Sequence, residues 1–329
     1  MHFRSEPRLL TPQCFADDSK RPNELKFNAN IAFRFFDNNS FVPKIIDMKI
    51  YKVLPDLSKR RHMSIWHKAL RAQWSADDLN WSAPLRMTSD KTLSGLARIL
   101  TPILMGEQAA LYSVSGLIPI LGQNSEVESQ LYLTTWAVDE ARHTELFTLF
   151  YNRIAREPLP IRRFPSGYMF QSSIVSQEPA EWLAGVLVSE CLAKLAMEEF
   201  KRLDLDPVLS EISRGILEDE ARHLAFNHIY LEDRFSQYFR KDLKEGESFG
   251  ERLRGRLTQV LSNVPSIFDT LEADMKEIGM DRHELQERLA EDAMARLNRS
   301  VDAGANLAKG AISADEAARA ERGAIAGKL

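Results

Sequence analysis

The five-residue string DEARH occurs twice in this chain, at residues 139–143 and again at residues 219–223. In each copy the glutamate and the histidine are three positions apart, so on a helix their side chains leave the same face, about one turn apart. A single copy of so charged a string is most often a solvent-exposed, salt-bridged helix face. Two identical copies instead favour two halves of one site.

A largely apolar segment with one glutamate precedes each copy. TPILMGEQAALYSV holds Glu107, 33 residues before Glu140, and AGVLVSECLAKLAM holds Glu190, 30 residues before Glu220. An ionised carboxylate inside an apolar bundle is costly unless it is paired or binds a cation. Four carboxylates that converge there therefore predict a bound pair of metal ions.

The residue types indicate which metals these would be. One glutamate from each of two helices, and a Glu-x-x-His pair from each of two others, make up the di-iron or di-manganese carboxylate site of four-helix bundles. Carboxylate oxygens with one imidazole nitrogen per metal suit iron or manganese better than structural zinc, which favours cysteine. The predicted metal ligands are Glu107, Glu140, His143, Glu190, Glu220 and His223, and the four glutamates among them are also the predicted catalytic groups.

The other letters of DEARH predict an outer layer of partners. A metal-bound histidine usually donates its second ring N–H to a carboxylate, which assigns that role to Asp139 and Asp219. We expect crossed pairs, Asp139 with the histidine of the second copy and Asp219 with that of the first, because within one copy the two side chains aim differently. Arg142 and Arg222 would neutralise the two aspartates in the bundle interior.

The spacing of apolar residues predicts an all-α fold, a four-helix bundle with additional N- and C-terminal helices. We expect helices near residues 61–73, 90–119, 125–156, 175–203 and 207–235, with a proline-rich crossover, EPLPIRRFPSGYMF, before the fourth. ERLRGRLTQVLSNV and DRHELQERLAEDAMARL predict two more helices with a break at Gly279, and the tail from Ala311 is a helix or a frayed end. We expect one domain over residues 1–329, in which residues 1–89 pack on the bundle, 90–235 form the di-metal core and 236–329 form C-terminal helices.

Composition narrows the class of protein. The net charge of -4, from 43 basic and 47 acidic residues, gives no electrostatic basis for binding nucleic acid or an anionic membrane. Neither a signal peptide nor an uninterrupted apolar membrane span is indicated. Two cysteines far apart predict neither a disulfide framework nor a zinc site, and a cytoplasmic location is expected.

Residues 90–235 resemble the ferritin-like di-iron carboxylate oxygenase superfamily, through the repeated glutamate and Glu-x-x-His pattern. TTWAVDEARHTELF and LEDEARHLAFNHIYL are closest to the ribonucleotide reductase small subunit and its ligand-binding oxidase relatives. The resemblance implies two iron ions, with a manganese/iron pair as the alternative, and a homodimer. It also implies that Trp136, four residues before the second-helix glutamate, hydrogen-bonds another ligand; simple core filling is the alternative.

Departures from these relatives narrow the implied function. Phe147 stands where the reductase subunit keeps its radical tyrosine, and Gly185 and Ala110 stand where the ligand-binding oxidases join a tyrosine to a valine. Ile216 replaces the third histidine of the arylamine N-oxygenases. Lys194 stands where hydrocarbon monooxygenases often have a threonine; it would hold an acidic substrate or deliver protons, or form an ordinary Glu–Lys pair.

These features predict an O2-dependent di-iron monooxygenase that hydroxylates or N-oxygenates a small organic substrate. Small residues near the ligands indicate a substrate pocket, which we place at Ala110, Phe147, Gly185 and Lys194. Because the chain has no flavin or nicotinamide fingerprint, an external reductase or ferredoxin would supply electrons. The alternatives are a radical-generating subunit like that of ribonucleotide reductase, an acyl desaturase and, least favoured, an iron-storage protein.

Overall fold

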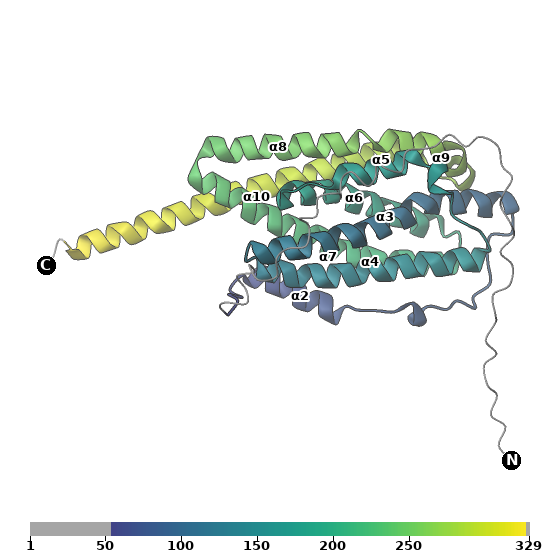
Figure 1. Ribbon diagram of the computed structural model, residues 1–329, viewed down its shortest axis with the longest axis horizontal. Helices are drawn as coiled ribbons and strands as arrows, with labels where there is room; N and C mark the ends of the chain where they lie inside the picture. The colour runs from purple at the N-terminus through teal and green to yellow at the C-terminus, as the bar shows by residue number, and fades with distance from the viewer. Residues whose placement is uncertain (1–53, 327–329) are drawn as a thin grey trace, which may run out of the picture. The chain divides into compact units, whose positions relative to one another are not determined.

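The computed structural model describes residues 54–326, and the predicted features of residues 1–53 lie outside the described residues. Within that part the chain forms α-helices and two short 3-10 turns, with no strand, as predicted (Figure 1). The helices are α2 (Arg60–Arg71), α3 (Asp90–Gln123), α4 (Val127–Ile154), α5 (Pro165–Ile174), α6 (Pro179–Leu203), α7 (Pro207–Lys241), α8 (Leu243–Leu261), α9 (Val264–Ile278) and α10 (Arg282–Ala326).

Four long helices, α3, α4, α6 and α7, form the bundle that was predicted from the two repeats. α3 packs on α4 and α6 on α7, while α3–α6 and α4–α7 contacts join the two pairs (Figure 1). The helix starts follow ordinary capping chemistry. The Ser89 side chain accepts a hydrogen bond from the Thr92 N–H at the start of α3. The Asp206 side chain, directly before Pro207, accepts hydrogen bonds from backbone N–H groups in the first turn of α7. The repeat in the sequence thus corresponds to a repeat of helix pairs.

α3 is the one helix among the described residues that is long and apolar enough to cross a membrane. It nevertheless carries a buried glutamate, Glu107, and contacts α4, α5, α6 and α9. A helix with these neighbours has the character of a core helix of the bundle. Some of its apolar residues, among them Leu104 and Met105, pack against the core but are only partly buried.

Two helices were not foreseen. The crossover contains α5. Pro165 does not prevent this helix, because it occupies the first helical turn, where its missing N–H is not needed. α9 lies between the two predicted C-terminal helices, begins with Pro265 in its first turn and ends at Gly279, whose φ of 85° is a left-handed C-cap. The predicted break at Gly279 is present, and it follows α9.

Candidate metal centre

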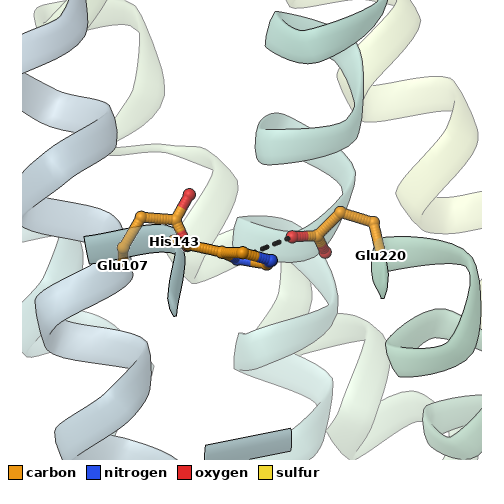
Figure 2. A group of neighbouring side chains, drawn as sticks. All are labelled: Glu107, His143 and Glu220. Carbon is orange, nitrogen blue, oxygen red and sulfur yellow. Dashed lines mark hydrogen bonds and ion pairs between the residues drawn. The ribbon is translucent and has the colours of Figure 1, made fainter. Parts of the chain in front are cut away.

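The six predicted ligands come together in the middle of the bundle, one glutamate each from α3 and α6 and a Glu-x-x-His pair each from α4 and α7. All are buried, and the two histidines are fully shielded from solvent. The ligand atoms form two groups, each lying within 4.8 Å of one another: Glu107, His143 and Glu220, and Glu140, Glu190 and His223. Figure 2 shows the first group, with His143 between the two glutamates.

Both histidine rings point the same nitrogen inward. His143 Nδ1 lies 3.2 Å from Glu107 Oε2 and 3.9 Å from Glu220 Oε1. His223 Nδ1 lies 3.0 Å from Glu190 Oε2 and 3.5 Å from the nearest oxygen of Glu140. The two halves of the site are therefore arranged alike, with one inward nitrogen in each.

The cluster fits a pair of cations on its donor chemistry. It offers four carboxylates and two imidazole nitrogens, the set that suits iron or manganese. Glu140 Oε2 and Glu220 Oε2 are buried and have no hydrogen-bond partner among the described residues. Unpaired buried carboxylate oxygens are costly, and bound cations would satisfy both.

Without cations, the crowded acids shift one another's pKa values. Burial raises the pKa of Glu107 to about 7 and raises the pKa values of Glu190 and Glu220 well above the usual range. Burial alone would lower the pKa of each histidine, but the surrounding carboxylates raise that of His223 to about 9 and that of His143 well above its usual value. The site thus holds protons that bound metal ions would displace.

The outward nitrogens make the crossed pairs that the sequence predicted. His143 Nε2 lies 3.0 Å from Asp219 Oδ2, and His223 Nε2 lies 3.3 Å from Asp139 Oδ2. Arg142 donates to Asp219 at 2.9 Å and also to Asp139. Arg222 donates to the same two aspartates. Two buried aspartates and two buried arginines therefore form one closed network behind the histidines.

One family model matches part of this chain, and known structures share its fold. A model of the family described as P-aminobenzoate N-oxygenase AurF matches residues 119–250, a stretch that contains every cluster residue except Glu107. An R2-like ligand-binding oxidase variant with an aerobically reconstituted Mn/Fe cofactor is 16% identical, with a TM-score of 0.61 over 76% of this chain and 97% of its own. A second structure of such an oxidase, also with a Mn/Fe cofactor, is 15% identical, with a TM-score of 0.59 over 76% and 96%.

These comparisons support the predicted resemblance to the ferritin-like di-iron carboxylate superfamily, through a family model over residues 119–250 and through a shared fold with R2-like oxidases. The predicted resemblance to R2-like proteins within that superfamily is confirmed. Within the stretch that matches the N-oxygenase model, Ile216 is apolar and fully buried, and no third histidine stands at this position.

The segment just after α2 contributes two groups that sequence analysis missed. The Trp74 indole donates to Asp219 Oδ2 at 2.9 Å, and the Gln73 amide donates to Asp139 Oδ1 at 3.1 Å. Trp74 also packs against Gly215 of α7, where a Cβ would come within 2.4 Å of its ring. The two side chains lie more than 60 residues from either aspartate in sequence, so no local spacing could have shown these contacts.

Trp136 differs in detail from the expectation. Its indole donates to Glu140 Oε1 at 2.7 Å, which is the glutamate of its own helix and not a ligand from another. Its ring stacks on His223, with centroids 4.5 Å apart and an interplanar angle of 17°. Trp136 therefore holds one candidate ligand through a hydrogen bond and another through ring contact.

A narrow, apolar cavity of about 90 Å³ opens onto all four glutamates. It runs between α3 and α6 and is also lined by α5, α9 and the start of α10. The small residues Ala110, Ser189 and Ala193 are part of its lining.

Three of the four predicted pocket residues do not line this cavity. Lys194 binds Glu198 and Asp292 at 3.1 and 3.4 Å and lines a separate cleft beside α10. Gly185 lies against the backbone of Ile174, where a Cβ would meet the carbonyl oxygen at 2.8 Å. Phe147 is fully buried in the core. Only Ala110 is where the prediction placed it.

Proposed function

We propose that the protein is an O2-dependent di-iron oxygenase that hydroxylates or N-oxygenates a small organic molecule. The observation that carries this proposal is the cavity that opens directly onto the four glutamates of the cluster. A bound pair of iron ions, or one manganese and one iron ion, would supply O2 binding and reduction. One oxygen atom enters the substrate, and two electrons and two protons convert the other to water. The family description and the Mn/Fe cofactors of the similar structures support this chemistry.

The residues of the chain have distinct parts in this proposal. The glutamates of α3, α4, α6 and α7 and the two inward Nδ1 atoms would hold the ions. The crossed aspartates fix the orientation of both imidazole rings through Nε2. Apolar residues such as Ile103 and Leu192 line the cavity and exclude water from the reacting groups.

Electrons would come from an outside donor, and one contact path favours an entry point. Trp74 is partly exposed, and its indole donates a hydrogen bond to Asp219. Asp219 in turn contacts His143. An oxidisable indole is thereby joined to the cluster through one carboxylate. A reductase or ferredoxin that docks beside the segment after α2 would deliver electrons along this path.

The same path favours a second candidate function, a radical-generating subunit that oxidises a partner protein. Against it stands Phe147, because a phenylalanine cannot hold the stable radical of a tyrosine. The oxygenase is therefore the preferred function, and a product that contains oxygen from O2 would separate the two.

The test begins with metal quantification in the purified full-length chain, followed by anaerobic reduction and mixing with isotopically labelled O2. We expect two metal ions per chain, transient optical changes after mixing, and label in an added amine or hydrocarbon. Glu140→Ala and Glu220→Ala should each lose metal, because each removes a carboxylate from the cluster.

Glu145→Ala and Glu218→Ala are the matched controls, since both residues are exposed on the same two helices. They should keep full metal content. Unchanged metal content in Glu140→Ala would refute the site. Metal binding without consumption of O2 would refute the oxygenase and leave the metal site standing.

A further inference from the structure

The cavity is long and thin, which limits what can enter it. Its lining on α3 runs from Ile99 to Ala110, a span of about 16 Å at the rise of an α-helix. α9 lies along this span, since Arg98 binds Asp274 near one end. A volume of about 90 Å³ over such a length accommodates a slender chain better than a bulky ring system.

The lining has a polar end and an apolar end. The glutamate cluster marks the polar end, while residues such as Leu271, Met275 and Leu285 line the remainder. Besides the four glutamates, the polar lining residues are Gln171 and Ser189, both neutral, and no lysine, arginine or histidine of the described chain lines the cavity. A substrate therefore finds no protein cation to pair with an acidic group there.

Gln171 is placed to select a polar group. Its amide nitrogen lies 3.5 Å from the position that a Cβ on Gly106 would take, and Gly106 directly precedes Glu107. It is partly buried on α5 and makes no hydrogen bond to the part of the chain that the structure describes. The Ser189 hydroxyl, in contrast, already donates to the Val186 carbonyl at 2.9 Å. The carboxamide thus has a free donor and a free acceptor beside the cluster.

We propose that the cavity takes a slender, uncharged and mainly apolar substrate, and that Gln171 determines specificity by hydrogen bonding a neutral polar group on it. The group would lie beside the glutamates, with the apolar body between α3 and α9. This proposal rests on the proposed function and names the class of its substrate. A neutral hydrogen bond at a partly buried site is worth about a two- to tenfold difference in affinity.

Binding of two probes of equal length tests this assignment: hexanamide, which has a neutral polar head, and 1-hexene, which has none. Calorimetry on the full-length, metal-loaded, oxidised chain without reductant measures binding and involves no turnover. We expect hexanamide to bind more tightly. Gln171→Leu, which keeps the size of the side chain but removes its polar group, should weaken hexanamide about fivefold and leave 1-hexene unchanged.

Ser172→Ala, on the exposed side of the same helix, is the control and should keep the preference of the natural chain. If Gln171→Leu keeps that preference, or if neither probe binds, the proposal is refuted. Failure of the proposed function has a different signature, because probe binding would then depend on Gln171 while labelled oxygen never enters any product.

Discussion

At the scale of single residues, charge pairing decides which side chains the interior can hold. Asp139 and Asp219 are buried with almost no exposure, and each accepts hydrogen bonds from both Arg142 and Arg222. Removal of one partner from such a network leaves an uncompensated buried charge. The aspartates orient the histidines, and the arginines are therefore required to neutralise these buried aspartates.

Arg222→Met should consequently lower the free energy of unfolding by about 3 to 5 kcal/mol, because both aspartates lose a cation that water cannot replace. Urea denaturation of the metal-free chain measures the change. Arg214→Met is the control on the same helix. Its ion pair with Glu218 is 3.7 Å long and well exposed, so the change should stay within about 1 kcal/mol. An equal effect of the two substitutions would contradict the assigned role of the network.

Residue spacing predicted the cluster well and the cavity poorly, for a geometrical reason. Glu140 and His143 lie on one helix face, and the repeat fixed the partner helices. Lys194, four residues after Glu190, is rotated by about 40° around the helix axis, and that rotation turns it towards α10. Gly185 is about 140° away from Glu190 by the same measure. Residue spacing gives the angle of a side chain around its own helix. It does not show which neighbouring helix packs against that side chain.

At the scale of elements, the helices outside the repeat give the site its surroundings. α5 and α9 line the cavity, and α2 leads to the segment that contacts Asp139 and Asp219. Proline concealed α5 and α9 in the sequence, because each begins at or beside a proline that also reads as a helix breaker. Their amphipathic character becomes informative only once the bundle surface that they cover is known.

α2 carries a buried histidine, His62. His62 is 2% exposed, and its Nε2 has no hydrogen-bond partner among the described residues; Asp233 Oδ2 is 3.9 Å away, too far for such a bond. Burial, and then Lys59 and Arg61, lower the pKa of His62 to about 4, although Glu128 acts in the opposite direction. Its ordinary value of 6.5 applies in the unfolded chain.

The folded chain holds His62 neutral. Its contribution to the free energy of unfolding is therefore fully present above pH 6.5. It is lost as pH falls towards 4, when the unfolded chain takes up the proton more readily. The difference amounts to about 3 kcal/mol. Denaturation of the natural chain and of His62→Leu between pH 7 and pH 4 measures this difference. The natural chain should lose more stability over this pH range than the variant does. His67→Leu, exposed on the same helix, should retain that dependence; loss of it there would contradict the assignment to His62.

At the scale of the whole molecule, the two-fold repeat of helix pairs could be predicted from the sequence. Few folds other than a metal-binding helix bundle can bury four carboxylates together. The fold class followed from it. The outer surface is less constrained, since polar and apolar side chains are both tolerated in water. One helix stands out: an 18-residue window of α3 has a mean hydropathy of 1.2, yet only 22% of that window is fully buried. Most of the remaining residues in this stretch are partly buried, and such partly exposed apolar side chains are typical of a partner surface.

We propose that a second copy of the chain covers this face of α3. Light scattering after gel filtration should give twice the monomer mass of 37.5 kDa. Leu104→Glu, at a partly buried position on α3, should shift the protein to monomer, because a charge would be desolvated in the interface. Val175→Glu, 49% exposed just after α5, should leave the dimer intact. Circular dichroism verifies that both variants fold. A folded Leu104→Glu chain that remains dimeric would place the interface elsewhere, and a monomeric natural chain would exclude the homodimer.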